Sequence, residues 1–231
     1  MKAIITCAGM GKRLLPITKE IPKCMVKILD KLLIQYTIDN LCKCDIDEVI
    51  IVDNYKKEIL EEYLSSENIP IKITYITQEI IDGTANAVYS TRNNIDNNFI
   101  VLAGDTIYKV EDIKKLIKNT NSVLYTRKNK INKIEYGTLE IKNGFITRIA
   151  EKVTPVSNLV NCNGYNFTID VFDYIEKTPY DDRFNEKIIT NTINLMIMYG
   201  YKFSGIEIES LDEISRIDDI KKLEEKIKDE Y

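Results

Sequence analysis

Two glycines and two cations occur close together near the start of the chain, between residues 7 and 23. Gly9 and Gly11 allow the backbone to turn sharply and to bring its N–H groups close to an anion. Arg13 and Lys23 add fixed positive charges at a spacing that suits neighbouring phosphate groups. A short apolar segment precedes the turn, so the pattern predicts a triphosphate site after a strand.

Two common glycine motifs do not account for this turn. A P-loop needs glycine where Thr6 stands, and a Ser or Thr where Arg13 follows the Gly-Lys pair. A dinucleotide fingerprint needs a third glycine at the position of Leu14. An ordinary strand-to-helix turn with solvated basic residues remains the alternative.

Two further segments place polar side chains after expected strands. Gln78 precedes Gly83-Thr84-Ala85, which puts a side-chain amide beside exposed backbone groups, an arrangement that suits the flat edge of a nucleobase. Asp105 ends the apolar run 100–104, where a carboxylate can ligate Mg²⁺ while the ion bridges phosphate oxygens. A structural glutamine and a helix N-cap aspartate are the respective alternatives.

The stretch from Ala8 to Tyr36 resembles the N-terminal signature of the sugar-1-phosphate nucleotidylyltransferases. Its portions 18–23 and 30–36 are most similar to the bacterial UTP:glucose-1-phosphate uridylyltransferases, and the segments around residues 78–85 and 104–105 resemble the base-recognition and Gly-Asp elements of that family. The resemblance implies catalytic roles for Arg13, Lys23 and Asp105. It implies nucleotide binding by Ala8, Gly9, Gly11, Lys12, Gln78, Gly83 and Thr84.

The second half of the chain resembles the acceptor elements of the same family. The implied sugar-phosphate-binding residues are Tyr136, Gly137, Glu151, Lys152 and Asn161. Taken alone, the Glu-Lys pair would be ordinary solvated surface. Asn163 replaces the usual glycine of the strand that follows Asn161, and Asn tolerates the left-handed backbone region better than most residues.

A second Mg²⁺ ligand is expected from the acidic segment near the end of the chain. The segment 211–219 aligns imperfectly with the late metal-binding pattern of the family, and Glu213 takes the position of its carboxylate. Asp212 is the competing ligand, and a solvated acidic turn is a third interpretation.

The resemblance implies transfer of a nucleotidyl group from a nucleoside triphosphate to a sugar 1-phosphate, with Mg²⁺ as cofactor. UTP or dTTP is favoured. The Gln78 amide can match the imide edge of uracil or thymine, but an amide can flip and does not by itself exclude CTP. The preference rests on Gly83-Thr84-Ala85, which resembles the sugar-linked members of the family. The alternatives are a CTP-dependent phosphocholine or phosphonate cytidylyltransferase, and a catalytically silent nucleotide-sensing protein with the same fold.

Composition narrows the chemistry further. The 231 residues contain no histidine, which excludes imidazole bases and histidine-ligated metals, and the net charge of −4 disfavours nucleic-acid binding. The sequence contains no apolar run that is long enough to predict a membrane-spanning helix. The five cysteines are scattered without a C-x-x-C pair, which indicates reduced thiols and a cytoplasmic protein. The sequence leaves open whether the chain forms homo-oligomers.

The elements that must position these residues follow an alternating order. Strands are expected at 3–7, 48–53, 71–77 and 99–103, and helices at 33–42, 57–65, 84–93 and 113–118. This alternation predicts an α/β protein with a mixed, mostly parallel central sheet covered by helices, and the resemblance specifies a Rossmann-like nucleotidyltransferase fold. Ligands lie beyond the carboxyl ends of strands in such sheets.

The pattern changes in the second half. Alternating residues on either side of Asn143-Gly144 predict a β-hairpin over 139–149, on the acceptor side. Strands are then expected at 163–168 and 203–208, and helices at 170–177, 186–199 and from about 218. No linker composition separates the halves, so residues 1–231 are expected to form one domain, with 1–120 mainly binding the nucleotide and 121–231 mainly binding the sugar phosphate.

Overall fold

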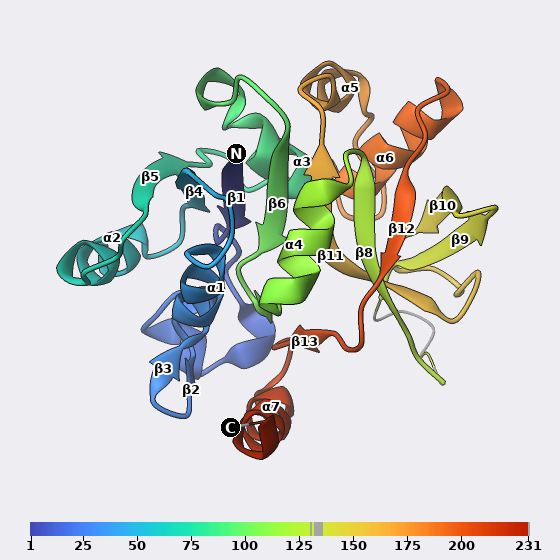
Figure 1. Ribbon diagram of the computed structural model, residues 1–231. Helices are drawn as coiled ribbons and strands as arrows, with labels where there is room; N and C mark the ends of the chain where they lie inside the picture. The colour runs from blue at the N-terminus through green and yellow to red at the C-terminus, as the bar shows by residue number, and fades with distance from the viewer. Residues whose placement is uncertain (130, 132–135, 231) are drawn as a thin grey trace.

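The computed structural model of the chain describes residues 1–129, 131 and 136–230 (Figure 1). Within these residues, four strands of the first half lie parallel in the order β5-β4-β1-β6. They are β1 (Lys2–Thr6), β4 (Glu48–Asp53), β5 (Lys72–Thr77) and β6 (Phe99–Ala103). The apolar runs of β1, β4 and β6 are typical of parallel strands that helices cover on both faces. The expected parallel arrangement is therefore correct for this half.

The second half extends the same sheet with mixed directions. Its strands are β8 (Ser122–Arg127), β9 (Thr138–Lys142), β10 (Phe145–Ala150), β11 (Leu159–Phe167) and β12 (Ser204–Glu207). The order continues β6-β11-β8-β12-β10-β9, and only the β8–β12 pairing in it is parallel. β9 also pairs with β11 through Thr138 and Val160, so this part of the sheet is partly closed. The whole sheet is accordingly mixed rather than mostly parallel in its pairings.

The predicted hairpin is confirmed. Asn143 and Gly144, at φ angles of 54° and 80°, join β9 to β10. Positive φ at both central residues is the requirement of the tight turn that Asn-Gly favours. Asn163 also adopts a positive φ of 55°, and the register of β11 against β8 shifts between Asn161 and Tyr165.

Helices cover both faces of the sheet (Figure 1). On one face, α1 (Leu33–Leu41), α2 (Lys57–Ser66) and α4 (Val110–Lys118) pack against alternate residues of the central strands, such as Ala3 and Ile5 of β1. On the other face, α3 (Thr84–Tyr89), α5 (Val171–Lys177) and α6 (Ile189–Met198) pack around Ile4 and the aromatic cluster of Phe99, Phe167 and Phe172.

The last helix, α7 (Ile217–Glu230), lies beside two small sheets (Figure 1). One pairs β2 (Lys27–Ile28) with β3 (Lys31–Leu32), and the other pairs β7 (Thr106–Ile107) with β13 (Asp212–Glu213). Leu223 and Ile227 of α7 pack with Ile214 and Leu14 in a small third core. This core links the end of the chain to the glycine turn at its start.

Short 3-10 turns connect the remaining segments, at Lys12–Leu14, Ile17–Lys19, Lys23–Met25 and Arg92–Asn94. In the part of the chain that the structure describes, no helix is both long and apolar enough to span a membrane.

Candidate active site

A pocket of about 340 Å³ opens at the carboxyl ends of β1, β5 and β6 and extends toward the β9–β10 hairpin. Fourteen of the predicted site residues line it: Ala8, Gly9, Arg13, Lys23, Gln78, Gly83, Thr84, Asp105, Tyr136, Gly137, Glu151, Lys152, Asn161 and Glu213. They come from segments more than 200 residues apart in the sequence. The fold therefore brings the proposed nucleotide and acceptor residues into one cavity.

Gly11 and Lys12 are not among the lining residues. Gly11 has a φ of 61°, and a Cβ there would lie 2.8 Å from the Thr18 side chain and 3.1 Å from the Lys23 Cβ. The Thr18 hydroxyl donates to the Gly11 carbonyl over 2.8 Å. Gly11 therefore shapes the turn and allows the Lys23 segment to approach it, whereas the backbone at Gly9 is open toward the pocket.

Two carboxylates lie near Arg13 and Lys23, at what we call the proposed phosphate end of the pocket. Glu213 pairs with Thr106 in the β13–β7 ladder, and the Ile214 amide donates to the Asp105 carbonyl over 2.9 Å. Lys23 forms an ion pair with the Asp105 carboxylate. Burial, together with the negative charge of Asp105, raises the pKa of Glu213, while Ser215, Lys23 and Arg13 favour its ionised form.

This donor set fits a magnesium ion. Mg²⁺ is usually held by one or two carboxylates, and it takes its other ligands from water and substrate phosphates. Within the described residues, no three or more acidic or cysteine side chains form a metal cluster, so an ion at Asp105 and Glu213 would need those substrate oxygens. A cation there would also offset the repulsion between the two carboxylates.

The two candidate ligands in β13 have different surroundings. Neighbouring residues in a strand point to opposite faces. Glu213 lines the pocket, whereas both Asp212 oxygens accept from Lys226 Nζ of α7, at 2.6 and 2.7 Å. Asp212 is thus engaged away from the phosphate end, and Glu213 is the carboxylate placed beside Asp105.

Gln78 lines the pocket with Gly83 and Thr84, at the proposed nucleotide end, and is only 4% exposed. Its Nε2 donates to the Gly83 carbonyl over 3.2 Å and lies 3.5 Å from Asp82 Oδ1. With the amide in this assigned orientation, its nitrogen is engaged by the protein, and the side-chain oxygen is the atom that can accept from a base.

Gly83 and Thr84 also have a structural role. A Cβ at Gly83 would lie 2.2 Å from the Lys187 carbonyl oxygen, and the Ile189 amide donates to the Thr84 hydroxyl over 3.0 Å. These contacts join the start of α3 to the start of α6. The nucleotide segment and the acceptor side of the pocket are thereby connected.

Glu151 lines the proposed acceptor end of the pocket. Burial raises the pKa of its carboxyl, and Lys152, Thr190 and Arg183 counteract that effect. A Cβ at Gly137 would lie 2.6 Å from Glu151 Oε2, so the glycine leaves the space in which this carboxylate sits. A carboxylate in this position can accept hydrogen bonds from vicinal sugar hydroxyls.

Neighbouring residues complete this end of the pocket. The backbone N–H of Asn161 donates to the Gly137 carbonyl over 2.9 Å. The side-chain Nδ2 of Asn161 donates to the Tyr165 hydroxyl over 2.8 Å. Lys128 Nζ lies 3.8 Å from the centre of the Tyr136 ring, and Lys152 Nζ lies 4.9 Å from that of Phe184.

The sequence analysis missed the contribution of the segment before α6. Glu186, Ile188, Ile189 and Thr190 line the pocket, and the Thr190 hydroxyl lies 3.4 Å from Glu151 Oε2. Arg183 donates to the Glu151 carbonyl over 3.0 Å. These residues carry no local motif of nucleotide chemistry, and only the packing of α6 against α3 and β10 brings them to the site.

Two cysteines, Cys7 and Cys24, also line the pocket. A hydrogen bond with Cys24, together with burial, raises the pKa of the Cys7 thiol well above its usual value. A protonated thiol is a poor nucleophile. Cys7 is therefore not an activated nucleophile for covalent catalysis.

Cations and carboxylates line one pocket at the carboxyl ends of parallel strands, and comparison with known proteins gives the class of protein. The sequence model of the nucleotidyl transferase family matches residues 2–210, and the chain belongs to that family. The resemblance of the Ala8–Tyr36 stretch is thereby confirmed.

Three relatives are similar along most of the chain. UTP–glucose-1-phosphate uridylyltransferase AglF of Haloferax volcanii is 30% identical over 90% of this chain and 88% of its own. D-glycero-alpha-D-manno-heptose 1-phosphate guanylyltransferase of Campylobacter jejuni is 35% identical over 75% of this chain and 78% of its own. Bifunctional protein GlmU of Methanocaldococcus jannaschii is 32% identical over 89% of this chain. The chain spans about half the length of that bifunctional relative.

A crystal structure of UDP-glucose pyrophosphorylase complexed with UDP-glucose has the same fold. It matches with a TM-score of 0.89, over 100% of this chain and 99% of the other, at 22% identity. This match agrees with the α/β architecture that the sequence predicts.

Proposed function

We propose that the chain transfers a nucleotidyl group from a nucleoside triphosphate to a sugar 1-phosphate and releases pyrophosphate. The observation that carries this proposal is a single pocket with Arg13, Lys23, Asp105 and Glu213 at one end and Glu151 at the other. Phosphates would occupy the first end, and the hydroxyl groups of a sugar the second. The names of two relatives, a guanylyltransferase and a uridylyltransferase, agree with this reaction class.

The proposed reaction needs no general base. The phosphate oxygen of a sugar 1-phosphate is already anionic at neutral pH, and it would attack the α-phosphorus in line as the bond to pyrophosphate breaks. Arg13 and Lys23 would stabilise the negative charge that gathers on the phosphates. Asp105 and Glu213 would hold Mg²⁺, which supplies further charge neutralisation and orients phosphate oxygens. The absence of histidine from the chain is compatible with this chemistry.

The remaining residues would orient the two substrates. The nucleotide would lie mainly on residues 1–120 and the sugar phosphate mainly on residues 121–231, with Glu213 reaching across to the phosphates. Glu151 would accept from sugar hydroxyls, and positioning of this kind is a large part of nucleotidyl transfer catalysis.

The preferred nucleotide is proposed to be UTP or dTTP, with glucose 1-phosphate or a similar hexose 1-phosphate as acceptor. Gln78 supports this preference, because its amide nitrogen is engaged by Gly83 and its oxygen can accept from a base. Uracil and thymine carry an N3–H donor, whereas N3 of cytosine is an acceptor. The names of the relatives include both a uridylyltransferase and a guanylyltransferase, so the family alone leaves the base undetermined.

Pyrophosphate release tests the proposal directly. We would combine UTP, dTTP, CTP, GTP and ATP with glucose 1-phosphate, other hexose 1-phosphates and phosphocholine, in the presence of Mg²⁺. The highest kcat/KM is expected for UTP or dTTP with a hexose 1-phosphate. A preference for CTP with phosphocholine would assign the chain to the cytidylyltransferases. Nucleotide binding without pyrophosphate release from any pair would favour a sensing protein.

A further inference from the structure

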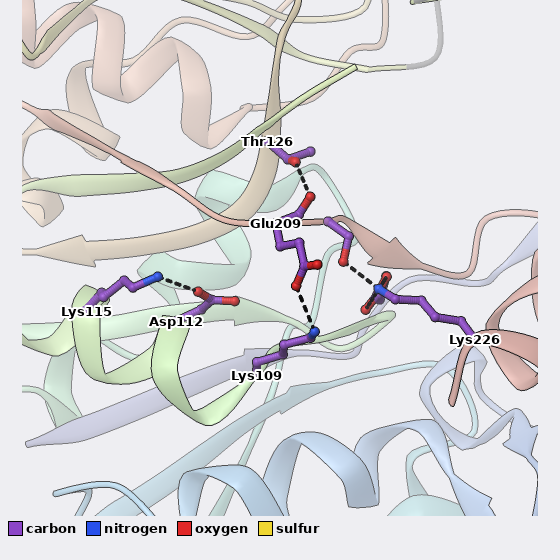
Figure 2. A network of polar contacts seen from close by, with 8 residues as sticks. Lys109, Asp112, Lys115, Thr126, Glu209 and Lys226 are labelled. Atoms are coloured by element: carbon purple, nitrogen blue, oxygen red, sulfur yellow. Dashed lines mark hydrogen bonds and ion pairs between the residues drawn. The ribbon is translucent and has the colours of Figure 1, made fainter. Parts of the chain in front are cut away.

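The segment that carries Glu213 is held in place by an ammonium group outside the pocket. Lys226 Nζ of α7 contacts both Asp212 oxygens and lies 2.5 Å from Ser210 Oγ (Figure 2). The Asp212 side chain is 13% exposed and that of Lys226 is 32% exposed. A partly buried ion pair of this kind is screened less by solvent than a surface pair.

The same segment has further anchors on either side of this pair. The Thr126 hydroxyl donates to the Glu209 carbonyl over 3.1 Å, and the Ile214 amide donates to the Asp105 carbonyl (Figure 2 shows the first). Ile214 packs with Leu223 and Ile227 of α7. The backbone is therefore tied to β8 before β13 and to α7 and β7 at β13 itself.

The orientation of the Asp212 side chain constrains the orientation of the Glu213 side chain. In a strand, two adjacent side chains cannot turn to the same face without a change in the backbone. As long as Lys226 holds Asp212 on the α7 side, Glu213 must face Asp105. Without the ammonium group, the partly buried Asp212 carboxylate would lose its ion pair with Lys226, and fuller exposure of that charge to water would require a change in β13.

We infer that Lys226 is a positioning residue that selects Glu213, and not Asp212, as the second carboxylate of the metal site. This inference rests on the proposed function, since it concerns the Mg²⁺ that Asp105 and Glu213 would hold. Lys226 is not among the residues that line the pocket, and it acts through Asp212. Partners in such outer positions commonly change metal affinity by about 10-fold to 10²-fold when they are replaced.

Metal binding, measured without turnover, tests this role. The full chain would be saturated with the α,β-methylene analogue of UTP, and Mn²⁺ would be titrated and followed by electron paramagnetic resonance. The Lys226→Met variant is expected to bind Mn²⁺ about 10-fold or more weakly than the wild type. Lys226→Arg should remain within roughly 3-fold, because it keeps a cation that can contact the Asp212 carboxylate.

A double variant separates positioning from general destabilisation. If Lys226 acts through Asp212, then Asp212→Asn combined with Lys226→Met should bind Mn²⁺ no more weakly than Lys226→Met alone. Glu209→Gln is the matched control on the same segment, because it removes the ion pair with Lys109 at a side chain that is 81% exposed. This control should bind Mn²⁺ as the wild type does. Circular dichroism and Tm would establish that each variant is folded.

The outcomes are distinct. Wild-type affinity in a folded Lys226→Met variant, or weaker Mn²⁺ binding by the double variant than by Lys226→Met alone, would overturn the positioning role. Asp105→Asn provides the reference for the proposed function, since it should lose Mn²⁺ binding. If Asp105→Asn and the wild type bind Mn²⁺ equally, the metal assignment fails, and the role of Lys226 fails with it.

Discussion

Replacement of Gly137 by alanine should separate the acceptor site from the stability of the fold. The new Cβ would lie 2.6 Å from Glu151 Oε2. Ordinary van der Waals contact begins near 3.4 Å, so the carboxylate oxygen must move by about 0.8 Å. The backbone at Gly137 is outside the positive-φ region, and alanine can adopt it without strain.

The size of the expected effect follows from that displacement. The obstructing atom is the far end of a flexible side chain, so the fold can accommodate the methyl group at little cost, and Tm should change by no more than a few degrees. A displacement of about 1 Å in a positioning group can nevertheless reduce turnover by about 10²-fold. We therefore expect kcat/KM for the sugar phosphate to fall by roughly 10-fold to 10²-fold.

The assay would follow pyrophosphate release while glucose 1-phosphate is varied at saturating UTP. Affinity for the nucleotide alone, measured by calorimetry, should stay near that of the wild type, because Gly137 is at the acceptor end. A kcat/KM within about 3-fold of the wild type would refute the assignment of Glu151 to the acceptor. Equal losses in nucleotide binding and acceptor use would indicate a general distortion of the pocket.

Four other variants test the rest of the pocket. Arg13→Ala and Lys23→Ala should each reduce turnover by about 10²-fold or more with the fold intact, since each removes a preorganised charge at the phosphates; near-normal turnover in either variant would exclude that role. Gln78→Ala should narrow discrimination against CTP by about 10-fold in kcat/KM, because the variant lacks the oxygen that can accept from N3–H; unchanged discrimination would move base recognition elsewhere. Burial raises the pKa of Glu151, so the folded protein binds that proton more tightly than the unfolded chain does. The wild type should lose stability relative to Glu151→Gln as pH rises above about 4.3 and through the folded-state pKa. Thermal unfolding of both proteins between pH 4 and 7 measures this, and a Tm difference that does not change with pH would contradict it.

Local patterns in the sequence were sufficient for most secondary-structure elements. Apolar runs such as β4 and the Asn143-Gly144 turn have strong short-range preferences, and the structure has them where they were predicted. β8 (Ser122–Arg127) is not among the predicted elements. It is defined by pairing with β11 and β12, which lie more than 30 residues away in the chain, and no local signal reports such a pairing.

The order of the strands was predictable only in part. Alternation of strands and helices in the first half implies parallel neighbours, because a crossover helix returns the chain to the same edge. In the second half, β11 pairs with β6 and also pairs with β9, which partly closes the sheet. That closure depends on long-range contacts between faces, and hydrophobic periodicity carries no information about it.

For the site, the sequence by itself determined the types of chemical group: glycines and cations after one strand, a carboxylate after another, and a Glu-Lys pair far along the chain. Only the tertiary structure decided which of these groups meet. Asp212 and Glu213 are adjacent and chemically alike, but in the folded chain Asp212 pairs with Lys226 of α7, whereas Glu213 lines the pocket. The segment that contains Thr190 joined the pocket in the same way. A sequence specifies residue types and local backbone preferences, whereas the direction of a side chain depends on partners that are distant in the chain and close only after folding.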